Sequence, residues 1–149
     1  MTESSTGKLK SLIELIGAGA ILAGLVFVGL ELRQNTAAVQ ADTFQNLTAL
    51  TTEYMLLLAT DENLNRLNRK GRADLSSLDE TEASQFFNLR RTTWLRMQLA
   101  FLQWRRGTLD DEGWAFYRQF LCSYGNADDW QDHRNALLGS FVEVVESCD

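Results

Sequence analysis

The sequence contains no proline, a single histidine and two cysteines among its 149 residues. Proline interrupts helices, and half of the ten glycines fall within the first 30 residues, so the rest of the chain has few breaks in which a helix must stop. Residues with good helix propensity dominate the composition. We therefore expect an all-α fold whose helices are joined by short turns.

The shortage of histidine and cysteine also argues against catalysis. The chain has no H-E-x-x-H, paired C-x-x-C, G-x-x-x-x-G-K or G-x-S-x-G motif. A metal at His133 would rest on Asp129 one turn earlier, which offers too few ligands, so a solvated helix face is the simpler interpretation. Cys122 adjoins Phe120 and Leu121 and is better read as an inert thiol than as a nucleophile. We expect no catalytic residue, metal or cofactor, and no enzyme.

Charge and cysteine usage give two further expectations. The net charge is −6, and residues 107–149 carry nine acidic side chains against Arg118 and Arg134. Such an acidic region repels phosphate backbones, which argues against a nucleic-acid partner. Cys122 and Cys148 are too few for a disulfide framework. They can pair in an oxidising compartment or remain two thiols, and the sequence leaves both open.

Residues 15–30 contain no polar side chain, and residues 12–32 include only Glu14 and Glu31. At about 1.5 Å per residue the longer stretch spans ~31 Å, close to the ~30 Å hydrocarbon core of a bilayer. Nine large apolar residues contribute about −4 kcal/mol to insertion. We predict a tail over residues 1–11, a transmembrane helix over 12–32 that lies in a lipid bilayer, and a helical soluble domain over 33–149.

Two alternatives to an anchor stay open. A buried helix of a soluble core normally keeps a polar stripe, which is absent here. A cleaved signal peptide is suggested by Lys8 and Lys10, but the apolar run is long for one and the best cleavage site, at residues 39–41, lies far beyond it. The positive-inside rule weakly favours a cytoplasmic N-terminus and an exported domain, because only Arg33 follows the run closely.

Small residues mark one face of the predicted membrane helix. Gly17, Ala20 and Gly24 recur at helical spacing and would let a second helix approach closely. We hypothesise that this face pairs with another copy of the chain or with the helix of a membrane-protein partner. The alternative is that the spacing is accidental, because glycine and alanine are common in membrane helices.

The soluble part has the pattern of a compact four- to five-helix bundle. An apolar stripe over residues 44–58 continues the membrane helix without a break, which predicts one helix over about 10–59. Asp61 can cap a helix over 62–70 that Gly71 ends, and Asp79 with Glu82 forms a capping box for a helix over 80–106. Helices are also expected after residues 110–112, after a cap in residues 126–129, and near the C-terminus.

Arg90 interrupts the apolar stripe of the predicted helix over 80–106, between Phe87 and Trp94. We hypothesise that it forms a buried ion pair with Glu53 across two facing helices, or receives a small anionic ligand within the bundle. The alternative is an arginine whose stem packs while its head reaches solvent.

Three segments carry a family resemblance: VGLELRQNT at residues 28–36, ADTFQ at 41–45 and GTLDDEGW at 107–114. Together they resemble an uncharacterised family of bacterial single-pass membrane proteins in which a transmembrane helix runs into an "RQNT" segment. The resemblance covers nearly the whole chain and implies an anchor and an architecture, but no activity. Relatives often carry basic residues where this chain has Ala37 and Gln40, which would favour a cytoplasmic domain.

Together with the resemblance, which implies the inner (plasma) membrane of a bacterium, these patterns predict a membrane-anchored, non-enzymatic helical interaction or scaffold protein with an accessory role. The alternative is a ligand-sensing helical domain that binds a small anionic molecule near Arg90.

Overall fold

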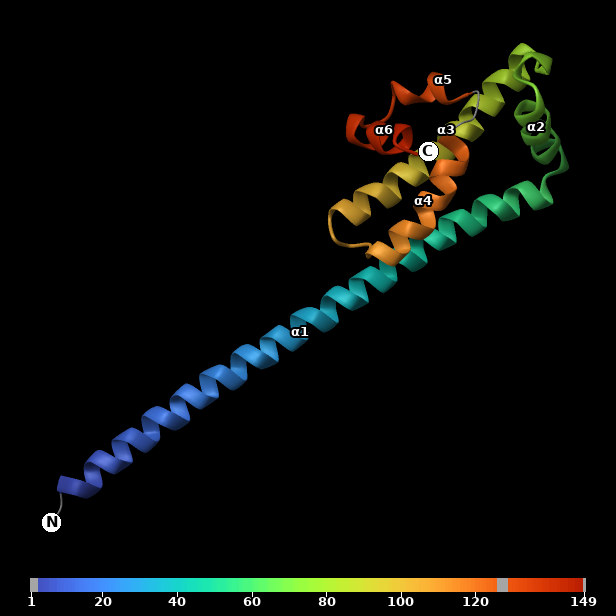
Figure 1. The fold of residues 1–149 in the computed structure, drawn as a ribbon. Coiled ribbons are helices and arrows are strands. Elements are labelled where there is room, and N and C mark those ends of the chain that lie inside the picture. The colour runs from blue at the N-terminus through green and yellow to red at the C-terminus, as the bar shows by residue number, and fades with distance from the viewer. Residues whose placement is uncertain (1–2, 126–128, 149) are drawn as a thin grey trace. The chain divides into compact units, whose positions relative to one another are not determined.

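The computed structural model describes residues 3–125 and 129–148, and over these residues the fold is all-α without a strand. Its elements are α1 (Glu3–Thr60), α2 (Glu62–Ala73), the short 3-10 helix η1 (Leu75–Ser77), α3 (Glu80–Arg105), α4 (Asp111–Gly125), α5 (Trp130–Arg134) and α6 (Gly139–Glu146) (Figure 1). The predicted fold class is therefore confirmed. The chain divides into two compact units, Met1–Val39 and Gln40–Asp149, and the described residues of the first unit, 3–39, all belong to α1.

Helix α1 runs without interruption for 58 residues. It covers the whole of the helix predicted over 10–59 and begins earlier, at Glu3. No proline or turn sequence falls within it, and it ends where Asp61 accepts a hydrogen bond from the backbone N–H of Leu64, 3.0 Å away, and caps α2. Its two parts differ in burial. Every side chain from residue 14 to residue 39 is exposed, whereas Leu47, in the second unit, is buried in the core.

The core of the second unit is built around α3. Trp94 and Phe101 of α3 are fully enclosed, together with Leu121 of α4 and Phe141 of α6. The rings of Phe101 and Phe141 lie 5.6 Å apart, and Trp94 packs on Trp130 of α5 at 4.7 Å. Aromatic rings at these separations fill the space between helices and add ring–ring attraction to the burial of apolar area. Four aromatic residues of the acidic C-terminal third are thus buried in the core: Trp114, Tyr117, Trp130 and Phe141.

The turn between α3 and α4 explains the GTLDDEGW segment. Gly107 has a φ of +74°, a left-handed conformation that ends α3 at little cost for glycine. Leu109 is buried, and the carboxylate of Asp110 accepts a hydrogen bond from the N–H of Gly113 at 2.8 Å, which caps α4. Gln40 donates to the carbonyl oxygen of Gly107 at 3.1 Å. The segment is therefore a structural turn and cap.

Two boundaries can be compared with the predicted ones. The capping box of Asp79 and Glu82 is present at the start of α3, as predicted. Gly71 does not end α2, which continues to Ala73, so that prediction was wrong. The reason for a glycine there is space: a Cβ at Gly71 would lie 2.5 Å from Cδ2 of Phe86, a core residue of α3. The cap expected in residues 126–129 falls mostly outside the described residues.

Candidate functional site

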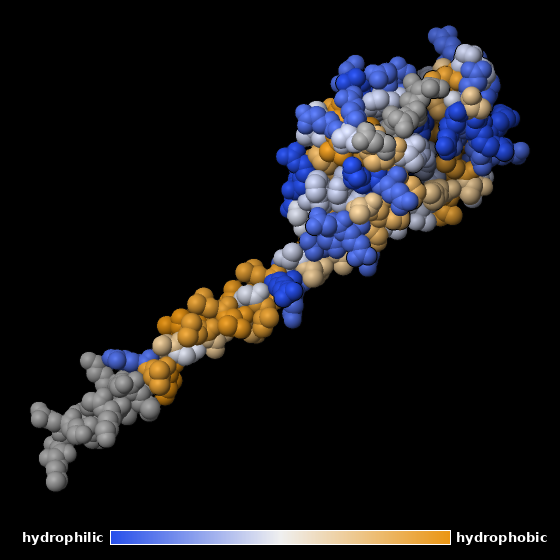
Figure 2. Space-filling view, viewed as in Figure 1, coloured by the Kyte–Doolittle hydropathy of each residue, from blue (hydrophilic) through white to orange (hydrophobic). Residues whose placement is uncertain are grey.

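The apolar segment of α1 presents its side chains outward on all sides. From Leu15 to Leu30 every large apolar side chain is at least half exposed. Figure 2 shows this stretch covered by hydrophobic side chains on the visible face. It belongs to one helix that is long and apolar enough to cross a membrane. Exposure of so much apolar surface to water is unfavourable in free energy. An apolar medium or another apolar surface is therefore expected to cover this segment.

The small residues of this segment lie on one continuous helix, as their spacing requires. Gly17, Ala20 and Gly24 are all exposed, and a Cβ placed at Gly17 or Gly24 would meet no other atom within 4 Å. In the described part of the chain this face is therefore accessible to a second helix.

Arg90 is engaged in a buried ion pair. Its Nε lies 2.6 Å from Oδ2 of Asp129 and its Nη2 lies 2.9 Å from Oδ1, a two-pronged contact in which each carboxylate oxygen accepts one hydrogen bond. Arg90 is 3% exposed, and its guanidinium also lies over the ring of Tyr124 at 4.7 Å. A charge withdrawn so completely from water needs such a partner, because an unpaired buried charge is strongly destabilising.

The predicted partner of Arg90 was wrong. Glu53 is exposed on α1, and the carboxylate that faces Arg90 comes from Asp129, at the N-cap position of α5. The interpretation of Arg90 as a packed stem with a solvated head was also wrong. Because Asp129 occupies two of its donors, Arg90 is not an open site for an anionic ligand. Asp129 lies 39 positions from Arg90, and no local sequence pattern marks it as the partner.

His133 is likewise buried, at 1% exposure, so its interpretation as part of a solvated face was wrong. Its ring stacks on Phe87 with centroids 4.5 Å apart, and its Nε2 lies 3.3 Å from Oδ2 of Asp129 without the alignment of a hydrogen bond. Burial lowers the pKa of His133 from its ordinary value, although Asp129 acts in the opposite direction. Burial thus favours the neutral form of the imidazole.

Cys122 and Cys148 form a disulfide, with their Cα atoms 5.2 Å apart. The interpretation of Cys122 as an inert thiol was therefore wrong, and the alternative of pairing is the one observed. The bond joins α4 to the chain just beyond α6. Sequence spacing cannot decide such a pairing, because it depends on how α5 and α6 fold back.

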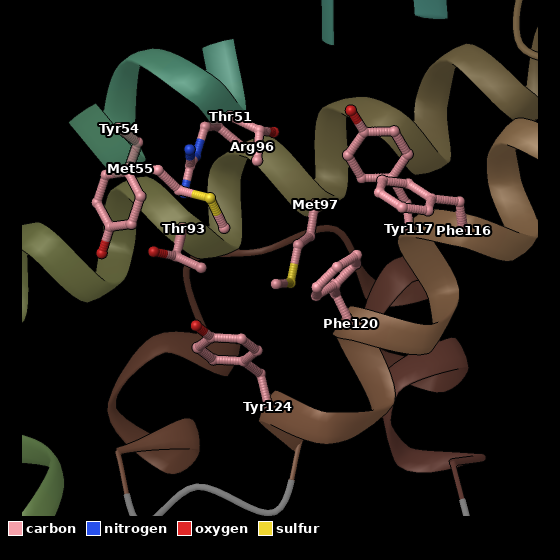
Figure 3. Close-up of a pocket in the computed structure, with 10 residues that line it drawn as sticks. All are labelled: Thr51, Tyr54, Met55, Thr93, Arg96, Met97, Phe116, Tyr117, Phe120 and Tyr124. Carbon is pink, nitrogen blue, oxygen red and sulfur yellow. The ribbon is translucent and has the colours of Figure 1, made fainter. Parts of the chain in front are cut away.

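A cleft in the second unit was not foreseen from the sequence. Side chains from α1, α3 and α4 converge on it (Figure 3), and it encloses about 70 Å³. Its lining is mostly aromatic and thioether, with one cation: Thr51, Tyr54, Met55, Thr93, Arg96, Met97, Phe116, Tyr117, Phe120 and Tyr124. The signal that could have found it is Arg96 of α3, which adjoins the buried Met97.

Arg96 lies in the wall of this cleft. Its Nη1 donates a hydrogen bond to the carbonyl oxygen of Leu50 at 3.2 Å, and its guanidinium lies 4.0 Å from the centre of the Tyr54 ring. Its Nε is buried without a partner among the described residues, as is the hydroxyl of Tyr117. Burial lowers the pKa of Arg96 from its ordinary value.

Comparison with known proteins adds no identification: no family model matches the chain, and neither a curated protein nor a solved structure is similar to it. Within residues 14–124 and 129–148, no group of three or more histidine, cysteine, aspartate or glutamate side chains is arranged to hold a metal ion.

Proposed function

We propose that this protein is a membrane-anchored, non-enzymatic helical interaction protein with an accessory or scaffold role. The observation that carries the proposal is the exposure of every side chain from residue 14 to residue 39, a stretch that includes the whole apolar run. A core helix of a soluble protein would bury its apolar side chains against the rest of the chain, and none of these is buried. A lipid bilayer supplies the missing apolar surroundings.

Fractionation of cells that express the full chain tests the anchor. The expected result is that the protein sediments with membranes, resists extraction by alkaline carbonate and dissolves only in detergent. Its intact mass should include the residues before Leu15, which distinguishes an anchor from a cleaved signal peptide. Recovery of the full-length chain in the supernatant without detergent would refute the proposal.

We further propose that the second unit lies outside the cytoplasm of a bacterial cell. Lys8 and Lys10 precede the apolar segment, and such residues favour the cytoplasmic side. The disulfide between Cys122 and Cys148 supports the same orientation, because disulfides persist in oxidising compartments. The family that the chain resembles often carries basic residues at the positions of Ala37 and Gln40, which would favour a cytoplasmic unit, and this difference calls for a direct test of orientation.

Two C-terminal fusions provide that test. With the second unit exported, a fusion to alkaline phosphatase should be active and a fusion to green fluorescent protein should be dark, because each folds on only one side of the membrane. The opposite pair of results would place the second unit in the cytoplasm.

We propose that the face formed by Gly17, Ala20 and Gly24 is the surface through which the membrane helix pairs with a second helix. Close approach of two backbones at small residues is the main source of packing between helices in lipid. A transmembrane association reporter should lose its signal on Gly24→Leu. Gly29→Leu is a matched control, because at about 100° per residue it lies on the opposite side of the helix from Ala20. An equal effect of both substitutions, or no effect of Gly24→Leu, would exclude this face.

A further inference from the structure

Two arginines of α3 stand in contrasting surroundings. Arg90 is neutralised by Asp129 through two hydrogen bonds. Arg96 has no such partner: among the described residues, no carboxylate lies within 4.0 Å of its guanidinium, and its charge is met by one carbonyl oxygen and the face of Tyr54. A guanidinium carries five N–H donors in a planar fork that fits a carboxylate. Arg96 is therefore an incompletely satisfied cation in the wall of a cleft.

We propose that this cleft binds a small monocarboxylate with a short apolar body, such as butyrate. The carboxylate would lie against the guanidinium of Arg96, where it supplies the anionic partner that the chain does not provide. The hydrocarbon part would lie among the rings of Tyr54, Phe120 and Tyr124, which line the same space (Figure 3). Ligand sites with apolar walls and a single charged group commonly divide recognition in this way.

Size and charge limit the ligand to this class. The cleft is small, about 70 Å³, and most of its lining is apolar, so it suits a carboxylate on a short hydrocarbon chain better than a large ring system. Arg96 is the only cation among the lining residues, which disfavours a doubly charged phosphate in apolar surroundings. The same cation repels an amine of equal size.

The three methionines of the chain provide an internal readout. Met55 and Met97 line the cleft, whereas Met1 belongs to the other unit. The full chain, labelled with ¹³C at its methionine methyl groups and held in phosphatidylcholine nanodiscs, is titrated with sodium butyrate. Butylammonium chloride and sodium chloride serve as controls of equal ionic strength. We expect saturable shifts of the Met55 and Met97 signals with butyrate alone, and no shift of the Met1 signal.

Arg96→Gln should weaken butyrate binding at least about tenfold, because the charge-assisted contact is lost. Arg91→Gln is the matched control: Arg91 is exposed on the same helix, and its removal changes net charge equally. Arg96→Lys keeps the positive charge but lacks the planar guanidinium, so it should bind butyrate with intermediate affinity. This second variant tests the same contact if Arg96→Gln does not fold.

The proposal is overturned by absence of a saturable shift up to about 100 mM butyrate, a concentration that would detect very weak binding. Three other results would overturn it as well. Butylammonium could bind as tightly as butyrate, or Arg91→Gln could weaken butyrate binding as much as Arg96→Gln does. Alternatively, both Arg96→Lys and Arg96→Gln could bind butyrate as tightly as the wild-type chain does. The outcome can be told apart from that of the membrane proposal, because the shifts of Met55 and Met97 report on the second unit, whereas failure to enter the nanodiscs would concern the anchor.

Discussion

The two units of the chain hold their apolar residues in opposite ways. From residue 14 to residue 39 a single helix exposes every side chain, whereas the second unit buries a core rich in aromatic residues, among them Trp94, Trp114 and Phe141. The apolar side chains of the first unit depend on an apolar environment outside the chain. Those in the core of the second unit pack against one another. Substitutions should therefore separate the two: changes in residues 14–39 should alter where the protein resides, and changes in the core should alter how stably it folds.

The largest effect is expected from two charges in the apolar segment. Leu22→Arg combined with Val26→Arg should move the protein from the membrane to the supernatant or to aggregates. Each change costs about 3–4 kcal/mol of insertion free energy, more in total than the favourable sum of the segment. Quantitative blotting of membrane fractions measures the effect. Leu50→Arg, at a side chain 43% exposed in the second unit, should stay membrane-bound. Equal loss in that control would mean that the two units are not separable.

The largest effect on folding is expected at the buried ion pair. Asp129→Ala leaves Arg90 charged without its partner and should lower the free energy of unfolding by about 3–5 kcal/mol. Replacement of both residues, Arg90→Met with Asp129→Leu, should restore most of that loss, since no uncompensated charge remains. Chemical denaturation followed by tryptophan fluorescence measures both. A double variant as unstable as Asp129→Ala would show that the pair itself, and not the orphaned charge, matters.

A somewhat smaller effect is expected from the disulfide. Cys122 and Cys148 are 26 positions apart, and closing a loop of that length restricts the unfolded chain by about 3–4 kcal/mol in the loop-entropy treatment. The Cys122→Ser, Cys148→Ser variant should lose stability by up to that amount. Reduction of the wild-type protein should produce the same loss, while reductant should not affect the variant. Membrane association should be unchanged in every sample.

The smallest effect is a pH dependence set by the chain's one histidine. Burial lowers the pKa of His133 in the folded state, so below pH 6.5 the unfolded state binds the proton more readily. Stability should be complete above about pH 7 and fall as the pH drops from there toward 5, by no more than about 1.4 kcal/mol per pH unit. His133→Gln should flatten the profile in this range. A profile of the same slope in the variant would assign the dependence to other groups.

Local features of the fold were predictable from the sequence, and long-range pairings were not. The continuous helix α1, the capping box at Asp79 and the stop at Gly107 depend on neighbouring residues, so their signals lie within a few positions. The partner of Arg90 lies 39 positions away, and it is chosen by how α5 packs against α3. A periodic pattern indicates that an arginine interrupts an apolar face, but it carries no information about which carboxylate arrives there.

The same limit applies to the candidate sites. Gly17, Ala20 and Gly24 could be placed on one face from spacing alone, because a single helix fixes their geometry. The Arg96 cleft needs three helices at once, and Gly71 was misread because the ring that requires it, Phe86, belongs to another helix. His133 was assigned to a solvated face because too few metal ligands lie near it in the sequence, whereas its packing neighbour Phe87 lies on α3.

The disulfide turns the end of the chain into a covalent ring that contains both Asp129 and His133. A protease that cuts one peptide bond between Cys122 and Cys148 therefore releases nothing, since the two pieces stay tethered through sulfur. Such a nick would be invisible on a non-reducing gel and apparent on a reducing one. The carboxylate that neutralises Arg90 is thereby kept close to its partner even after the backbone has been severed.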